Sequence, residues 1–167
     1  MASHDYEEFI AALNAHGVQY LIVGAHAVAF HARPRATKDL DILIESTAEN
    51  ARKVLDALRD FFGGADLGYT VEDLTAPDWI IQLGVAPVRI DLLTDILGFS
   101  RFADAWKNRV AGRFGSVPTY YLGLEDLIHA KEVSDRLQDR ADVRVLQRIR
   151  KAKRQIRPSS RRSKRRR

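Results

Sequence analysis

Hydrophobic and polar positions follow two different periods along the chain, and each period predicts a different kind of element. Apolar residues recur every three or four positions in 5–16 and again from about 46 to 62, as on one face of an amphipathic helix. The short apolar runs QYLIVG (19–24) and DLDILI (39–44) are instead rich in residues that favour strands. Between them, AHAVAFHA (25–32) favours a helix. The first part of the chain therefore predicts alternating helices and strands.

The remaining chain continues this mixture. DWIIQLG (78–84) and VRIDLLT (88–94) are separated by a short VAP turn, which predicts an antiparallel pair of strands. RFADAWKNRV (101–110) has helical character, and RFGSVPTYYLG (113–123) predicts a turn with one short strand. The last periodic segments predict closing helices at 123–134 and 139–152. The expected fold is α/β (α+β), with a mixed, mostly antiparallel sheet flanked by helices.

The composition is that of one globular domain with its own hydrophobic core. The chain has 167 residues, of which 46% are apolar, and this length suits a single domain. The absence of cysteine excludes disulfides and thiolate metal sites. No apolar run reaches the roughly 18 residues of a membrane span, and the acidic start MASHDYEEFIAAL does not resemble a signal peptide. We expect a cytoplasmic protein with no membrane segment.

The net charge of +5 is unevenly distributed. Residues 151–167 contain ten lysines and arginines and no acid, which leaves 17 basic and 22 acidic residues, or −5, in the rest. We expect a domain over 1–153 and a disordered basic tail over 154–167, since like charges repel one another. Such a tail is suited to bind RNA through its phosphates. Weaker binding to anionic lipid and a purely solubilising role are the alternatives.

Three acids interrupt apolar strands, where charged groups are costly to bury. Asp39 and Asp41 alternate with apolar residues, so they share one face of a strand about 7 Å apart. Asp91 lies between Ile90 and Leu92 in another strand. If the two strands are neighbours, the three carboxylates repel one another and require a cation, for which Mg²⁺ is the expected ion. The alternative is that these acids are solvated strand ends of an unrelated domain.

A glycine follows the first predicted strand, in LIVGA (21–25), and leads into a helix. Glycine at this position allows backbone N–H groups and the helix N-terminus to approach a phosphate. The alternative is that the glycine serves only the geometry of the turn.

These motifs and their order resemble the polymerase-β-like nucleotidyltransferase superfamily. The matching segments are VGA (23–25), DLDI (39–42) and IDL (90–92). Small bacterial and archaeal members are the most similar, including the toxin nucleotidyltransferases of type IV toxin–antitoxin (abortive-infection) systems. RATKDLDI (35–42) is similar to their R-x-T-x-D-hydrophobic-D signature. Their closing segment, a lysine helix followed by R-x-x-D-x-x-D, is similar to residues 124–146.

The resemblance implies a role for each motif residue. Asp39 and Asp41 would coordinate the metal, Mg²⁺ or alternatively Mn²⁺, and the nucleoside triphosphate. Asp91 would hold the metal nearer the acceptor and help to deprotonate its hydroxyl. Gly24 and Ala25 would meet the β- and γ-phosphates. The superfamily usually has serine or a second glycine at the second position, and Ala25 retains only the backbone donor.

Other candidates come from the signature and the closing segment. Arg35 is a candidate phosphate clamp, with a surface ion pair as the alternative. Thr37 belongs to the nucleotide-binding signature and is expected to shape the turn into the strand. Lys131 lies three residues after Ile128 and leans toward the packed side of its helix. The resemblance implies that this lysine reaches a phosphate, and the alternative is that it extends to solvent.

Weaker candidates complete the expected site. His26 follows the glycine turn and is expected to line the pocket. Asp139 and Asp142 are expected to act as a helix cap and a salt-bridge acid, with Arg136 and Arg140 supplying their pairs. Four aromatic residues are expected to pack in the core or at its edge rather than stack on bases: Trp79, Trp106, Tyr120 and Tyr121.

The expected activity is the metal-dependent transfer of a nucleoside monophosphate from a nucleoside triphosphate to an acceptor hydroxyl. The acceptor would be an RNA 3′ end or a protein side chain, and the basic tail favours RNA. The resemblance also implies a toxin–antitoxin component with an antitoxin-type partner protein. The alternative is a non-catalytic module of the same fold that binds nucleotide, RNA or a partner protein.

Overall fold

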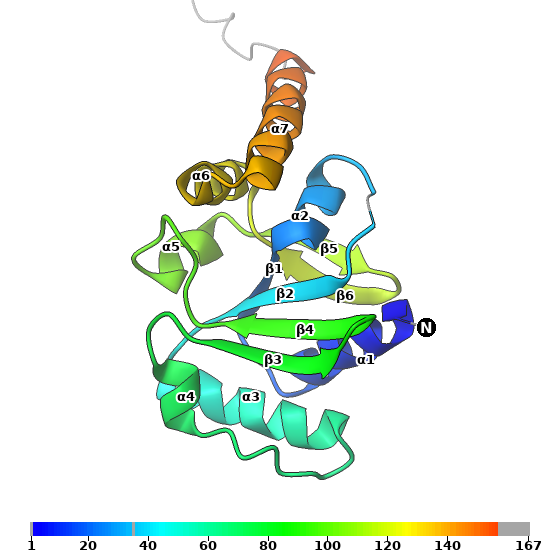
Figure 1. Ribbon diagram of the computed structural model, residues 1–167, viewed down its shortest axis with the longest axis vertical. Helices are drawn as coiled ribbons and strands as arrows, with labels where there is room; N and C mark the ends of the chain where they lie inside the picture. Colours follow the sequence, from blue (N-terminus) through cyan, green and yellow to red (C-terminus); the bar gives the residue numbers. More distant parts are fainter. Residues whose placement is uncertain (1, 35, 157–167) are drawn as a thin grey trace, which may run out of the picture.

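A six-stranded mixed sheet is the centre of the protein (Figure 1). The computed structural model describes residues 2–34 and 36–156. The strands are β1 (Tyr20–Val23), β2 (Asp39–Ile44), β3 (Ile80–Val85), β4 (Val88–Leu93), β5 (Val110–Phe114) and β6 (Val117–Tyr121). Their order across the sheet is β3-β4-β2-β1-β6-β5. The pairs β2–β4 and β1–β6 are parallel and the other three are antiparallel, which confirms the mostly antiparallel sheet.

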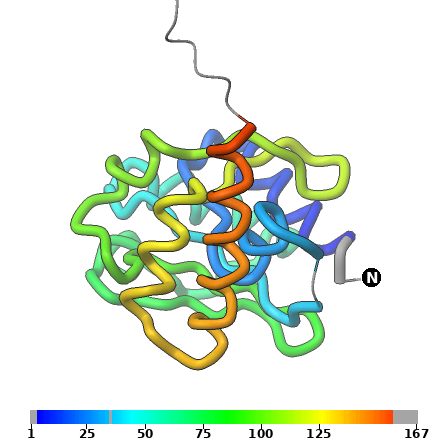
Figure 2. The backbone as a smooth tube through the Cα atoms, turned by 90° about the horizontal axis from the view of Figure 1, so that it is seen from above, coloured from blue at the N-terminus to red at the C-terminus, as the bar shows by residue number. Residues whose placement is uncertain are grey.

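Helices cover both faces of this sheet. They are α1 (Ala2–Ala15), α2 (Gly24–His31), α3 (Ala48–Phe61), α4 (Val71–Thr75), α5 (Phe102–Lys107), α6 (Leu124–Ser134) and α7 (Leu137–Ile156). Helices α1 and α3 lie on one face, whereas α2, α6 and α7 lie on the other (Figure 1). Figure 2 shows α6 and α7 side by side across that second face. None of the helices in the described ranges has the length and apolar character needed to cross a bilayer.

The alternation of side chains along the strands separates the core from the second face. Leu40 and Ile42 on β2 are fully buried, and the apolar stripe of α1, including Phe9 and Leu13, is fully buried as well. Each such side chain contributes about 1.5–3 kcal/mol through burial. Packing against α1 therefore stabilises the strand pairings from one face of the sheet. The acids that alternate with Leu40 and Ile42 project from the opposite face.

A buried asparagine fixes the start of α3 against the sheet. Thr47 caps α3, as expected for one of the two candidate cap residues, by accepting a hydrogen bond from the Asn50 N–H at 3.3 Å. The Asn50 amide accepts from the Gln19 N–H at 2.8 Å and donates to the carbonyls of Gln19, at 3.0 Å, and Glu45, at 2.8 Å. These bonds join the segments at the ends of β1 and β2.

Two elements differ from the expectation. The helix predicted over 101–110 ends at Lys107, and Val110 already belongs to β5, which pairs with β6 in an antiparallel hairpin. The local pattern concealed β5 because this edge strand is largely exposed and lacks a clear apolar face. Helix α4 was not predicted, and it is held by a capping box between Thr70 and Asp73.

The C-terminal helix α7 includes residues 154–156, which the sequence assigned to the tail. The expected disorder of the rest of the tail concerns 157–167, which lie outside the described residues.

Replacing Asn50 by alanine removes both the donor and the acceptor that serve the backbone of Gln19 and Glu45. We expect the free energy of unfolding to fall by about 2–3 kcal/mol, because the remaining groups lose their hydrogen-bond partners. Chemical denaturation measures this change. Arg52→Ala, an exposed position of the same helix, is the matched control and should change the free energy by less than about 0.5 kcal/mol. Equal stabilities of the two variants would contradict this role of Asn50.

Candidate functional site

The acids predicted from the sequence meet on the second face of the sheet. The parallel pairing of β2 and β4 places Asp41 directly opposite Asp91. On either side, Gln82 of β3 is opposite Asp91, and Val23 of β1 is opposite Asp41. Because paired residues project to the same face, these four residues form one row across the four strands. The two acid-bearing strands are thus neighbours, as the three-acid hypothesis requires.

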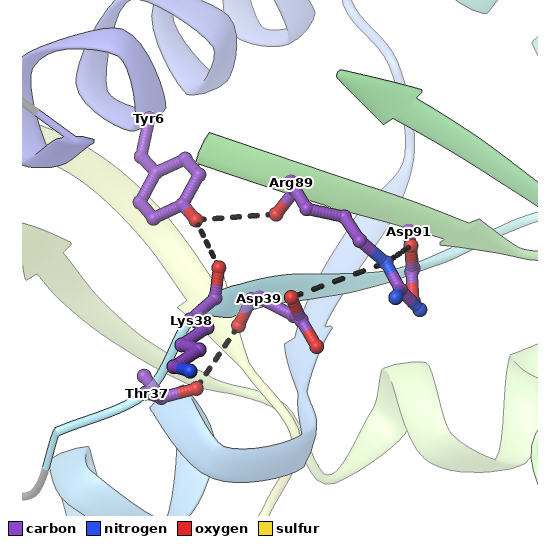
Figure 3. Close-up of polar contacts among 6 residues, drawn as sticks. All are labelled: Tyr6, Thr37, Lys38, Asp39, Arg89 and Asp91. Atoms are coloured by element: carbon purple, nitrogen blue, oxygen red, sulfur yellow. Dashed lines mark hydrogen bonds and ion pairs between the residues drawn. The ribbon is translucent and has the colours of Figure 1, made fainter. Parts of the chain in front are cut away.

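An arginine that the sequence analysis missed stands in the next row of the same face. Arg89 of β4 is opposite Asp39, and its Nε lies 3.9 Å from Asp39 Oδ1 (Figure 3). It also donates from Nε to Asp91 Oδ1 at 2.9 Å and from Nη2 to Oδ2 at 2.7 Å. The signal was present in the sequence, because Arg89 precedes Asp91 by two residues and therefore shares its face.

A buried tyrosine from the opposite side of the sheet clamps the two acid-bearing strands together. The Tyr6 hydroxyl of α1 is within hydrogen-bonding distance of two carbonyl oxygens, that of Lys38 at 2.8 Å and that of Arg89 at 3.2 Å (Figure 3). Burial raises the pKa of Tyr6, and the negative charge of Asp39 adds to this effect. Nothing in the local pattern around Tyr6 indicated this role.

The ionised form of Asp41, the middle acid of the site, is destabilised by its surroundings. Burial raises the pKa of Asp41 to about 6, and the nearby charges of Asp91 and Asp39 contribute further, while Lys131 and Arg89 oppose the shift. A carboxyl group with such a pKa gains from a cation that shares its environment.

The predicted glycine lies directly against this carboxylate. Gly24 has a φ of +65°, and a Cβ at this position would overlap Oδ2 of Asp41. Helix α2 begins here, and its cap residue Val23 provides no side-chain hydrogen bond to the first turn. The backbone donors of Gly24 and Ala25 thus begin a helix beside the acids, which suits the approach of an anion.

These residues line a cleft of about 790 Å³ between the sheet and α6. Gly24, Asp41, Arg89 and Asp91 form its floor, and Lys131 of α6 lies in its wall. The cleft therefore holds both carboxylates and cationic groups.

Lys131 is held by two buried acids. Its Nζ lies 2.8 Å from Asp139 Oδ1 and 3.1 Å from Asp142 Oδ2, and the side chain is 13% exposed. Although burial opposes it, hydrogen bonds from Lys131 and Ser134 lower the pKa of Asp139. Lys131 therefore lies on the packed side of α6, as expected.

The expected pairing of Asp139 and Asp142 with Arg136 and Arg140 is wrong. Lys131 supplies the ion pairs instead, because α6 and α7 pack against each other and bring its Nζ between the two carboxylates. The Arg140 guanidinium pairs with Asp135, at 2.7 Å. The exposed Arg136 lines the cleft.

Thr37 and His26 lie around the site rather than in it. Thr37 donates to the carbonyl of Asp39 at 3.2 Å, consistent with a role in shaping the turn into β2. His26 was expected to line the pocket, but its ring packs against Tyr6 and Phe114 and is not among the residues lining this cleft. Burial lowers the pKa of His26. Arg35 lies outside the described residues.

One aromatic expectation is wrong. Trp79 is 47% exposed and lines the cleft instead of packing in the core. The other three aromatics pack as expected: Trp106 contacts Tyr120 with the Arg109 guanidinium over both rings, and Tyr121 stacks on Phe30.

The donor set suits a hard divalent cation. Asp41 and Asp91 offer oxygen ligands from adjacent strands, with Asp39 on the same face, and Mg²⁺ prefers such ligands. Within residues 2–34 and 36–156, no group of three or more acidic, histidine or cysteine side chains is already arranged to hold a metal ion. Arg89 engages both oxygens of Asp91, so a cation at Asp91 would replace this ion pair.

The raised pKa of Asp41 predicts a pH-dependent stability. Because the pKa near 6 in the folded protein exceeds the value of 3.8 expected for a free carboxyl, ionisation between pH 4 and 7 destabilises the fold. Asp41→Asn should therefore increase the free energy of unfolding by about 1–3 kcal/mol at pH 7 in the presence of a chelator. The gain should shrink toward pH 4. Denaturant titrations at both pH values measure it, and an equal effect at both would contradict the prediction.

Comparison with known proteins identifies the family. A search of curated proteins finds no match. Residues 2–166 match the family described as "Nucleotidyl transferase of unknown function (DUF2204)". This match confirms the resemblance to nucleotidyltransferases that the strand acids and the glycine turn indicated. The chain belongs to this nucleotidyl transferase family.

Proposed function

We propose that the protein is a metal-dependent enzyme that transfers a nucleoside monophosphate from a nucleoside triphosphate to an acceptor hydroxyl. One observation carries this proposal: Gly24, Asp41 and Asp91 converge at the floor of one cleft. A helix N-terminus suits the phosphates of the donor, and adjacent carboxylates suit a metal.

The chemistry follows from this arrangement. The acceptor oxygen forms a bond to the α-phosphorus of the donor while the bond from that phosphorus to the bridging oxygen breaks, so pyrophosphate leaves. Asp91 helps to take the proton of the acceptor hydroxyl, and Asp39 and Asp41 would hold Mg²⁺ or Mn²⁺ with it. The bound metal would supply positive charge that stabilises the negative charge developing on the phosphate oxygens.

The other residues of the cleft position the donor. The backbone of Gly24 and Ala25 receives the β- and γ-phosphates, since Ala25 retains its backbone N–H donor. Asp139 and Asp142 hold Lys131 in place, so it can attract the triphosphate without itself leaving the packed helix pair. Exposed Arg136 at the same cleft adds a second cation.

A second candidate function is favoured by a specific observation. Arg89 satisfies Asp91 with two hydrogen bonds, so the carboxylates have an internal counter-ion without a metal. A non-catalytic module that binds nucleotide, RNA or a partner protein is compatible with this pairing and with Ala25. The two candidates differ in whether Mg²⁺ with a nucleoside triphosphate leads to a covalent product.

The transfer reaction can be tested with α-phosphate-labelled nucleoside triphosphates. We expect label on RNA or protein when the purified protein is mixed with Mg²⁺, total RNA and cell extract. Asp39→Asn combined with Asp41→Asn should reduce the label by at least about 100-fold, because the negative groups that hold the metal are lost. Asp56→Asn, an exposed acid of α3, is the matched control. Wild-type protein that gives no label, and no rise in melting temperature with Mg²⁺ and nucleoside triphosphate, would favour the binding module.

The basic C-terminal segment is expected to strengthen RNA binding through phosphate contacts. Residues 157–167 contain seven lysines and arginines, and their removal should weaken RNA binding about tenfold or more at 50 mM salt. The loss should nearly vanish at about 300 mM salt, because releasing counter-ions into more concentrated salt gains less free energy. Replacing the same residues by a neutral glycine–serine segment is the length-matched control. Equal RNA affinity with and without the segment at low salt would contradict its role.

A further inference from the structure

An apolar surface lies at the end of the cleft farthest from Gly24. It consists of Trp79 and Ile80 at the start of β3 with Leu97 and Phe99 in the loop after β4. Three of these side chains are unusually exposed for their size, with Trp79 at 47%, Ile80 at 53% and Leu97 at 57%. The cleft has carboxylates and cations at one end and the exposed Trp79 at the other. It therefore suits a ligand with a charged part and a flat, apolar part.

The fold holds this surface open by specific contacts. Asp78, directly before Trp79, has a φ of 52°, and its N–H donates to Asp95 Oδ2 at 2.8 Å. The Trp79 N–H donates to the Thr94 hydroxyl at 2.9 Å, and its carbonyl accepts from the Thr94 N–H at 3.1 Å. The left-handed backbone conformation of Asp78 and its hydrogen bond to Asp95 keep the backbone of Trp79 at the cleft.

The loop that carries Leu97 and Phe99 is held as well. His129 of α6 lies 3.0 Å from the Gly98 carbonyl through Nε2, and its ring packs edge-on against Phe99 at 5.7 Å. A Cβ at Gly98 would come within 2.8 Å of the His129 ring, so the loop and α6 are in close contact. The apolar end of the cleft therefore has two fixed walls, one from β3 and one from this loop.

The order of the strands determines which substrate would reach this surface. The row runs from Val23 of β1 to Asp41, Asp91 and Gln82. Strand β3 therefore lies beyond Asp91, at the far side of the row from β1 and the start of α2 (Figure 1). In the proposed transfer the pyrophosphate departs on the side of Gly24, and in-line attack places the acceptor on the other side of the α-phosphate. That side is the β3 end.

We propose that Trp79 stacks on the terminal base of an RNA acceptor strand, whose 3′ hydroxyl then lies at Asp91. An indole face stacks on any base, and Ile80 and Leu97 exclude water around it. The Arg89 guanidinium beside Asp91 suits the phosphate on the 5′ side of this terminal nucleotide. This inference rests on the proposed function for the direction of the substrates, and it commits to RNA rather than to a protein acceptor.

Fluorescence tests the stacking without requiring catalysis. The chain has two tryptophans, so Trp106→Phe leaves Trp79 as the only reporter. We expect an eight-nucleotide single-stranded RNA to quench this emission, and the same RNA with an abasic 3′-terminal residue to quench it far less. Trp79→Leu should weaken binding of the intact RNA at least about fivefold, whereas Trp79→Phe, which keeps a flat ring, should stay within about twofold. Val85→Ala, an exposed apolar position of β3 outside this cleft, is the matched control.

Several results would overturn the inference. Equal RNA affinity of Trp79→Leu and wild type, or equal quenching by the abasic strand, would show that no base stacks on Trp79. Quenching by a serine- and tyrosine-containing peptide but not by RNA would assign the surface to a protein acceptor. Loss in Trp79→Leu of the stabilisation by Mg²⁺ and nucleoside triphosphate would assign it to the donor base.

The failure of the inference is distinguishable from the failure of the proposed function. RNA-end-dependent quenching in a protein that transfers no nucleotide would support the stacking site and refute only the transfer reaction. Transfer to RNA that is unchanged in Trp79→Leu, without quenching, would refute the stacking site and leave the reaction intact.

Discussion

The parallel pairing of β2 and β4 brings Asp41 directly opposite Asp91. The charge balance of the whole cleft depends on this proximity of two carboxylates. Burial and mutual repulsion raise the pKa of Asp41, so the fold bears a free-energy cost at neutral pH. The chain offsets it with Arg89, whose guanidinium binds Asp91 on the same face. Additional positive charge beside Asp41 and Asp91 would lower this cost further.

Contacts from distant segments hold the site in register. Tyr6 of α1 contacts the backbone ahead of the acids on both strands, at Lys38 and Arg89. Lys131 of α6 is held by Asp139 and Asp142 of α7. Both anchors join the cleft to packed helices, so a ligand would meet a largely preorganised surface. Preorganised charge is what phosphoryl-transfer chemistry chiefly needs from a protein, since the donor itself supplies the leaving group.

The strand acids were predictable because a charged group within an apolar run is costly to bury. The glycine turn was predictable because glycine between a strand and a helix allows a backbone conformation that other residues rarely adopt. Arg89 was harder to find, since an arginine in a half-exposed strand is ordinary. Trp79 was misassigned because tryptophan is usually largely buried, whereas here it is 47% exposed and lines the cleft. Strand β5 was missed because its partner β6, not its own pattern, stabilises it.

By itself, the sequence determined most of the elements, the mixed character of the sheet, and the face on which Asp39 and Asp41 project, because these depend on periods of two and 3.6 residues within short segments. Tertiary structure alone decided that β4 pairs with β2 in the register that joins Asp41 to Asp91, and that Lys131 rather than an arginine pairs with Asp139 and Asp142. Register and ion pairing between remote segments depend on packing and charge across space, which no local period encodes.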